Sequence, residues 1–186
     1  IRVGGRSARI QAEVHKSVKA LQQQADRSEL TVPQIAAHSG VTPSTIYRRW
    51  GDLSELLADV AAERLRPVAD PEDTGHQVGD LKAYIEQYAE EFSAPAGRAL
   101  LRDLFSSSAD TSYTGQCCSY TYDHLRVIAE RASARGERPI DVQRIVDHVI
   151  APIMYRILFG GGALTETYWQ ALLEDVVASA ETPATG

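Results

Sequence analysis

Residues 31–50 read TVPQIAAHSGVTPSTIYRRW, and this stretch decides the fold of the N-terminal part of the chain. A short helical pattern stands on either side of Gly40, whose missing side chain permits the left-handed backbone of a sharp turn. Thr31 and Thr42 are polar residues that can cap a helix, and each precedes a proline suited to a first helical turn. The stretch therefore predicts two short helices, each capped by its threonine and joined by a tight turn.

The two faces of this predicted helix pair differ in composition. Five apolar residues are spaced to face inward and to fix the angle between the helices: Ile35, Ala36, Val41, Ile46 and Trp50. The outward set on the second helix is rich in donors and has no carboxylate: Pro43, Ser44, Thr45, Tyr47, Arg48 and Arg49. Such a helix brings its N-terminal residues to base edges in the major groove, while flanking groups hold phosphates. A DNA-reading helix-turn-helix is the hypothesis, and a core helix pair with one polar face is the alternative on this pattern alone.

Helical spacing of apolar residues continues through almost the whole chain, and no strand pattern stands out. Before the motif, a stripe from Ile10 to Leu21 predicts one helix, and after it Asp52 is positioned to cap another. The segment 67–79 is rich in proline, glycine and acidic residues, which indicates a loop or domain boundary. Another helix is expected to run from Pro139 to Phe159. We predict an all-α protein of about nine helices, beginning with a three-helix domain that contains the helix-turn-helix.

Charge is unevenly distributed along the chain, whose net charge is −6. Residues 1–66 contain ten Lys and Arg against seven Asp and Glu, whereas residues 67–186 contain nine against eighteen. A basic N-terminal part followed by an acidic remainder is typical of a DNA-binding protein with a separate ligand-sensing or dimerisation domain. No apolar run approaches the ~20 residues of a membrane span, and no secretory signal pattern is present. Cys117 and Cys118 are adjacent and rarely bridge in that arrangement, so the expected location is cytoplasmic, without membrane contact.

The order of residues around the motif resembles the N-terminal domain of TetR-family transcriptional regulators. The resemblance spans residues 9–66 and is carried by Thr31, Ile35-Ala36, Gly40-Val41-Thr42, Thr45-Ile46-Tyr47, Trp50 and Leu56. A looser likeness to the family's C-terminal domains involves residues 134–137 and 151–156. The resemblance implies a helix-turn-helix DNA-binding domain at 1–51, a connecting helix at 52–66 and a ligand-binding and dimerisation domain at 67–186. It also implies a homodimeric repressor that binds a palindromic operator in double-stranded DNA and is released by a small-molecule effector. An activator and an effector-independent DNA-binding protein are the alternatives.

The resemblance also implies which residues contact DNA. The predicted set is Thr31, Thr42, Pro43, Ser44, Thr45, Tyr47, Arg48 and Arg49. Within it, the residues from Pro43 to Thr45 are expected near bases, and Tyr47 and Arg49 near phosphate. Thr31 is expected to contact backbone phosphate from the first helix, and Arg48 is a candidate for either a base or a phosphate. The chain departs from the family at two places. Ser44 stands where a glycine is common, and Leu53-Ser54 stands where Lys-Glu is common, which removes a lysine that usually anchors phosphate.

Two further sets of residues are predicted in the C-terminal part. Apolar faces on the last two helices suggest a four-helix interface between copies, with an intramolecular core as the alternative. The predicted interface residues are Val146, Val149, Ile150, Ile153, Ile157, Trp169, Leu172, Leu173 and Val176. Amphipathic residues suggest a mostly apolar pocket for a small hydrophobic or aromatic effector. The predicted pocket residues are Tyr84, Tyr88, Phe92, Phe105, Cys117, Tyr120, His124 and His148.

An enzyme is the main alternative of another class. Cys117, Tyr120 and His124 share one helical face, but these groups are too few for a metal site. The sequence shows no zinc-protease motif, nucleophile elbow or glycine-rich phosphate loop. His15 and His38 are isolated in the sequence and are predicted to be solvated. We therefore predict no catalytic residue, no metal and no cofactor.

Overall fold

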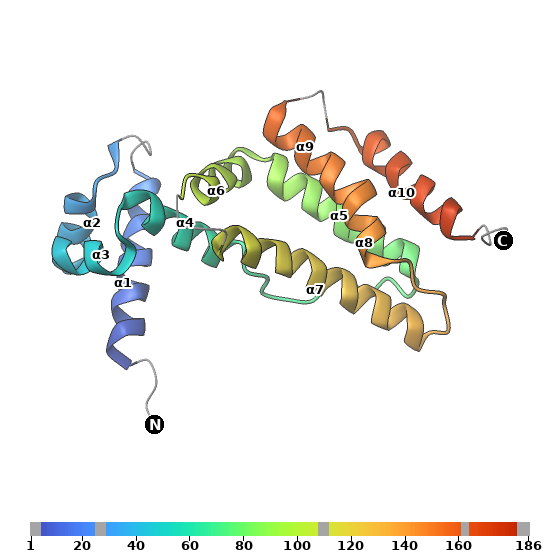
Figure 1. Ribbon diagram of the computed structural model, residues 1–186, viewed down its shortest axis with the longest axis horizontal. Coiled ribbons are helices and arrows are strands. Elements are labelled where there is room, and N and C mark those ends of the chain that lie inside the picture. Colours follow the sequence, from blue (N-terminus) through green and yellow to red (C-terminus); the bar gives the residue numbers. More distant parts are fainter. Residues whose placement is uncertain (1–4, 25–28, 108–111, 161–163, 182–186) are drawn as a thin grey trace. The chain divides into compact units, whose positions relative to one another are not determined.

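A computed structural model describes residues 5–24, 29–107, 112–160 and 164–181 of the chain. These residues form helices joined by loops and contain no strand (Figure 1). The helices are α1 (Gly5–Gln22), α2 (Val32–Ser39), α3 (Pro43–Trp50), α4 (Leu53–Arg64), α5 (Gln77–Ser93), α6 (Pro95–Phe105), α7 (Ser112–Ala134), α8 (Val142–Ile145), α9 (Ala151–Phe159) and α10 (Glu166–Glu181). Because a π-helical turn, Val146–Ile150, joins α8 to α9, the described residues make nine separate helical segments, which confirms the predicted fold class.

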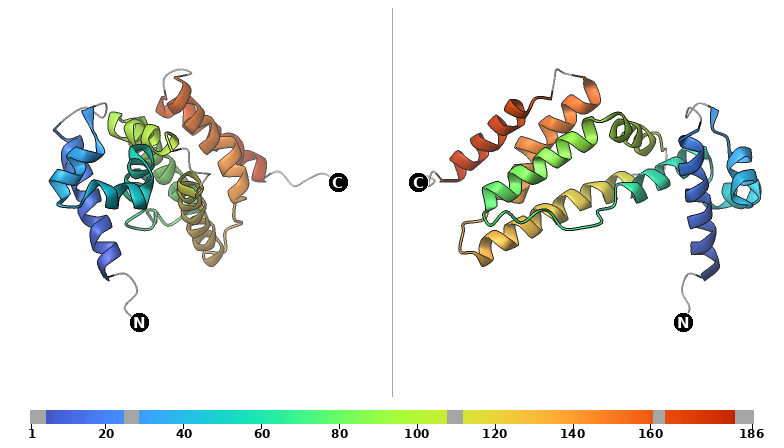
Figure 2. Two further views of the ribbon diagram at one scale, coloured as in Figure 1. Left: turned by 60° about the vertical axis from the view of Figure 1, so that its left-hand side comes forward. Right: turned by 180° about the vertical axis from the view of Figure 1, so that it is seen from behind.

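The chain divides into two compact units. The first contains residues 1–65 and 102–114, and the second contains residues 66–101 and 115–186. Figure 2 shows the helices of each unit from two further sides. None of the described helices is long and apolar enough to span a membrane.

In the first unit, α1 to α4 enclose one apolar core. Its fully buried side chains come from every one of these helices, and include Val14, Val18, Ile35, Ile46 and Leu56. The start of α4 is fixed as expected, because the Asp52 side chain accepts a hydrogen bond from the backbone N–H of Glu55 at 2.9 Å. Burial of these apolar faces, and not helix propensity, holds helices as short as eight residues.

In the second unit, α5, α7, α8, α9 and α10 share a second apolar core. Its members include Ile85, Leu125, Ile128, Ile145 and Ile153, each at most 2% exposed. The predicted helix start at Pro139 is wrong: Asp141 caps the helix, which begins at Val142. The helix is also not uniformly α. Pro152 lacks an N–H, and its ring crowds the preceding turn. That turn, Val146–Ile150, is a wider π-helical turn, in which the Ala151 N–H donates to Val146 O.

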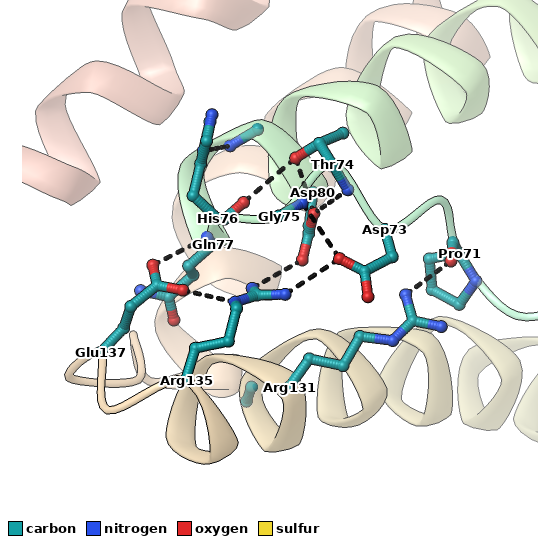
Figure 3. A network of polar contacts seen from close by, with 12 residues as sticks. Pro71, Asp73, Thr74, Gly75, His76, Gln77, Asp80, Arg131, Arg135 and Glu137 are labelled. Atoms are coloured by element: carbon teal, nitrogen blue, oxygen red, sulfur yellow. Dashed lines mark hydrogen bonds and ion pairs between the residues drawn. The ribbon is translucent and has the colours of Figure 1, made fainter.

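A polar network fixes the segment before α5 against the end of α7 (Figure 3). Asp80 is wholly buried, and its Oδ1 accepts from the backbone N–H and the hydroxyl of Thr74, each at 2.7 Å. Its Oδ2 lies 2.9 Å from Arg135 Nη2, and Arg135 Nε also donates to Glu137 at 2.6 Å. Glu137 in turn accepts from the backbone N–H of Gln77 at 2.8 Å. The buried carboxylate is thus fully paired, as a charge inside a protein must be.

Candidate nucleic-acid interface and effector cleft

The helix-turn-helix forms from the local signals that predict it. At the start of α2 the Thr31 backbone N–H donates to Gln34 Oε1 at 2.8 Å, and the Gln34 N–H donates to Thr31 Oγ1 at 3.4 Å. This reciprocal pair is a capping box. Gly40 ends α2 with φ of 68°, the left-handed conformation that the turn requires. Ile35 and Ile46 are fully buried across the turn, so the angle between α2 and α3 is fixed by their packing.

The outer face of α3 is solvated and carries no acidic side chain. Pro43, Ser44, Tyr47, Arg48 and Arg49 are exposed, and Thr45 is half-buried. The predicted side-chain cap by Thr42 is wrong, because its hydroxyl bonds other hydroxyls instead of the backbone. Thr42 Oγ1 lies 3.1 Å from Ser44 Oγ and 2.9 Å from Thr45 Oγ1. Three hydroxyl groups therefore cluster at the N-terminal end of α3.

The two arginines of α3 have different surroundings. No hydrogen bond or ion pair within the described ranges involves Arg48. Arg49 Nη1 donates to the backbone oxygen and the hydroxyl of Ser7, at 3.2 and 2.6 Å, and its Nη2 donates to Gln11 Oε1 at 2.6 Å. Its guanidinium also lies over the Trp50 ring, 5.1 Å from the centroid. Arg49 thus holds α3 to α1, whereas Arg48 has its donors available.

A cluster of partly buried polar side chains joins α1, α3 and α4, and no local sequence pattern predicts it. Asp59 on α4 accepts from Trp50 Nε1 at 2.7 Å and contacts His15 Nε2 at 2.9 Å. His15 is only 3% exposed, so the prediction that it is solvated is wrong. The one available signal is its place beside Val14 and one turn before Val18, on the buried side of α1.

The position that departs from the family at the start of α4 faces the interior. Leu53 is half-buried and packs against the core of the first unit. An apolar side chain there adds to the core and offers no cation to a phosphate. By contrast, Thr31, which is predicted to contact phosphate, is exposed. In the structure its hydroxyl donates to Gln34 Oε1 at 2.8 Å.

The second unit brings several of the predicted effector residues together. Along α5 the ring centroids of Tyr84 and Tyr88 are 6.1 Å apart, and those of Tyr88 and Phe92 are 4.6 Å apart. The His124 ring of α7 stands edge-on to Tyr84 at 5.5 Å. Burial raises the pKa of Tyr84 to about 12, against a hydrogen bond from Thr121 that lowers it, so its phenol stays neutral.

A surface cleft of about 350 Å³ lies beside this aromatic cluster. It is bounded by the segment 66–70 and by one face of α7, where Tyr120, Asp123, His124 and Val127 line it. Tyr120 and His124 belong to the predicted pocket. The structure does not bring Phe105 or His148 to this cleft: both are exposed, on α6 and on the π-helical turn. Cys117 is half-buried on α7, and burial raises the pKa of its thiol to about 11.

Most of the residues predicted at the interface between copies are already buried within one chain. Seven are at most 5% exposed and belong to the core of the second unit: Val149, Ile150, Ile153, Ile157, Trp169, Leu173 and Val176. Val146 and Leu172 are half-buried at the edge of the same core. The large apolar side chains that remain exposed on α9 are Tyr155, Leu158 and Phe159.

The first unit has the construction of a helix-turn-helix DNA-binding domain. Its second helix is held by buried residues at a fixed angle and presents an exposed, donor-rich face. Comparisons with known proteins agree. Residues 19–60 match the family model described as bacterial regulatory proteins, tetR family, and residues 71–176 match the model described as tetracyclin repressor-like, C-terminal domain. The chain therefore belongs to the TetR family of helix-turn-helix transcriptional regulators, which bind DNA.

Similar proteins carry the same designation. The uncharacterised HTH-type transcriptional regulator Rv1556 of Mycobacterium tuberculosis is 29% identical over 164 residues, covering 84% of this chain and 80% of that protein. The HTH-type transcriptional regulator YdeS of Bacillus subtilis, also uncharacterised, is 25% identical and covers 77% of this chain and 76% of its own length. The HTH-type transcriptional regulator AqdR of Rhodococcus erythropolis is 28% identical over 135 residues, which cover 71% of this chain and 65% of that protein.

Proposed function

We propose that the protein is a repressor that binds a palindromic operator as a homodimer and leaves it when a small molecule binds the second unit. The observation that carries the DNA-binding part is the outer face of α3, which is exposed and free of carboxylates. Pro43, Ser44 and Thr45 stand at its N-terminal end, where a helix in the major groove meets base edges. Tyr47 and Arg48 flank them, as phosphate contacts do.

A dimer is proposed because one short helix reads few bases, whereas two helices related by a dyad read a palindrome. Exposed apolar residues on α9 support a pairing surface there. Phe159 is 71% exposed and Tyr155 is 62% exposed, with their ring centroids 4.9 Å apart. Together with Leu158 on the same helix, they form an apolar patch of the kind that a second copy covers.

An effector is proposed to bind between the segment 66–70 and α7. Support comes from the cleft there and from the aromatic cluster next to it, since small-molecule sites combine apolar walls with a few polar groups. The effector must bind more tightly to the form that does not bind DNA, because equal affinity for both forms would shift nothing. In this scheme residues 1–51 read DNA, 52–66 connect, and 67–186 sense and pair. No catalytic role is assigned to any residue.

The test is to select DNA with the protein itself. The full chain is incubated with a random-sequence duplex library, and bound fragments are enriched and sequenced. We expect an inverted repeat, and footprinting should protect two half-sites about one helical turn apart or a multiple of it. A reporter promoter containing the enriched site should be silenced by the protein and restored by aromatic compounds that release it from DNA. Enrichment of no sequence would contradict operator binding, and activation of the reporter would contradict repression.

The dimer is tested by sedimentation. Wild-type protein at micromolar concentration should sediment as a dimer, and Phe159→Glu should sediment as a monomer because a charge cannot be buried unpaired in an apolar interface. Val78→Glu is the matched control, since Val78 is also an exposed apolar residue, at 42%, but lies on α5. A monomeric wild-type protein, or a dimeric Phe159→Glu variant, would count against this surface.

A further inference from the structure

Three side chains donate to one carboxylate oxygen between α1, α3 and α4. Asp59 Oδ2 accepts from Trp50 Nε1 at 2.7 Å, from His15 Nε2 at 2.9 Å and from Gln11 Nε2 at 3.1 Å. Trp50 is the last residue of α3. The oxygen of Asp59 therefore ties the C-terminal end of the DNA-reading helix to both helices beside it. We call Gln11, His15, Trp50, Asp59 and Glu63 the Asp59 cluster.

The geometry of His15 requires two protons on its ring. Its Nε2 faces Asp59 at 2.9 Å, and its Nδ1 faces Glu63 Oε2 at 2.6 Å. An ionised carboxylate can only accept a hydrogen bond, and a neutral imidazole has only one N–H. Both contacts are hydrogen bonds only when His15 is the positively charged imidazolium. With its side chain 3% exposed, no water can replace either partner at low cost.

Charged and titratable groups on several helices lie around the Asp59 cluster. Asp59 and Glu63 on α4 contact His15 directly. Lys19 on α1 contacts Glu63, Arg49 on α3 bonds Gln11, and Tyr113 on α7 interacts electrostatically with Asp59, Glu55 and Arg49. Lys19 Nζ lies 3.2 Å from the same Glu63 oxygen that His15 contacts. The nearest charges to His15 are thus two carboxylates, and they favour its charged form.

The pKa directions agree with this geometry. Burial alone lowers the pKa of His15, but the hydrogen bonds to Asp59 and Glu63 outweigh it and leave the pKa above its ordinary 6.5. Burial alone raises the pKa of Asp59 and of Glu63, and their hydrogen bonds to His15 reverse that as well. The cluster is therefore intact above the lowered pKa values of the carboxylates, and it weakens as pH rises through the raised pKa of His15.

We propose that His15 and Asp59 are positioning residues for the DNA-reading helix and that the charge on His15 makes DNA affinity depend on pH. This inference rests on the proposed function of α3. When His15 loses a proton, one of its nitrogens and the facing carboxylate become two acceptors in contact. That contact is repulsive, so α1 loosens from α4, and the Asp59 oxygen no longer holds Trp50 in one place. Affinity for DNA is thus high at pH 6 and falls toward pH 9.5.

The first measurement follows the cluster in the wild-type protein without DNA. Nitrogen NMR of the histidine rings reports the protonation of His15, and the indole N–H resonance of Trp50 reports its bond to Asp59. We expect both His15 nitrogens to be protonated at pH 6, and the Trp50 resonance to move with the same midpoint as His15 at higher pH. Trp169 is 3% exposed in the second unit, and its indole resonance should not follow.

The second measurement is DNA affinity against pH, using the duplex that the full chain enriches from a random library at pH 6. Wild-type affinity should fall about tenfold or more between pH 6 and pH 9.5, the effect of losing one charge-assisted hydrogen bond. His15→Gln cannot titrate and should keep one reduced affinity across the range. Asp59→Asn should bind more weakly than the wild type at pH 6, because Trp50 and His15 lose their charged acceptor. His38→Gln is the matched control, because His38 is exposed on α2 in the same unit, and it should keep the wild-type profile.

The outcomes separate this inference from the proposed function. A Trp50 resonance that stays fixed while His15 titrates, or a neutral His15 ring at pH 6, overturns the inference without any variant. A wild-type pH profile retained in His15→Gln, or a flat wild-type profile, overturns it as well. Enrichment of no duplex at any pH overturns the proposed DNA binding itself, a result on which the NMR titration does not depend.

Discussion

The different surroundings of the two α3 arginines lead to a prediction about salt. Arg48 is exposed and has no bonded partner in the described part of the chain, whereas Arg49 makes three hydrogen bonds to Ser7 and Gln11. A cation that contacts phosphate displaces counterions, and each such contact contributes about 0.9 to the slope of log affinity against log salt. A dimer has two copies of each arginine. Arg48→Ala should therefore reduce the slope by about 1.8, and Arg49→Ala should leave it nearly unchanged.

The magnitude is large enough to measure. Between 50 and 200 mM salt, a slope difference of about 1.8 makes the wild type lose roughly twelvefold more affinity than Arg48→Ala. Arg49→Ala should bind more weakly than the wild type at both salt concentrations, because the end of α3 loses its bonds to α1. Fluorescence anisotropy of a labelled operator duplex gives both slopes. Arg126→Ala is the control, since Arg126 is 59% exposed on α7 in the second unit. Equal losses of slope in Arg48→Ala and Arg49→Ala would refute this division of roles.

Three further predictions concern stability and are measured by urea unfolding. Ile46→Ala empties a fully buried site and should cost about 2–5 kcal/mol, unless the core collapses around it. Thr31→Ala removes the capping box of α2 and should cost about 1 kcal/mol, whereas Thr42→Ala, which has no side-chain cap to lose, should change the free energy of unfolding much less. Asp80→Ala leaves Arg135 and Thr74 without their buried acceptor and should lower the urea midpoint of unfolding. Asp70→Asn is the comparison and should lower the midpoint much less, because the Asp70 carboxylate is 73% exposed and lies 3.9 Å from Arg131. Equal midpoints for the last pair would show that the network in Figure 3 does not stabilise the second unit.

The helix-turn-helix was predictable because its signals are local. A capping threonine, prolines in first turns and Gly40 act within a few residues, and the apolar spacing states which side of each helix is buried. The Asp59 cluster was not predictable in this way. His15 and Asp59 are 44 residues apart, and Gln11 and Asp59 are 48 apart. Only the packing of α1 on α4 brings them together, so the sequence showed His15 as an isolated histidine.

The predicted dimer residues illustrate a second limit. Periodicity shows that a helix face is apolar, and it does not show what covers that face. Ile153 and Trp169 satisfy the pattern of an interface as well as that of a core, and in the structure both lie in the core of one chain. Phe159 lies on the same helix as Ile153, but its exposure depends on where α5 and α10 pack. The predicted effector residues show the same limit. Histidine is a residue type that often lines pockets, but in the structure His148 is exposed to solvent.

The two ends of α3 are built differently, and the difference suits the reading of DNA. At the C-terminal end, Trp50 and Arg49 are bonded to residues of α1 and α4, and the Trp50 bond is partly shielded from water, which strengthens it. At the N-terminal end, the hydroxyls of Thr42, Ser44 and Thr45 bond mainly to one another in contact with water. Those bonds can be exchanged for bonds to base edges at little cost. One end therefore sets the angle of the helix while the other adapts to sequence, so changes at Ser44 should alter base preference with little loss of stability.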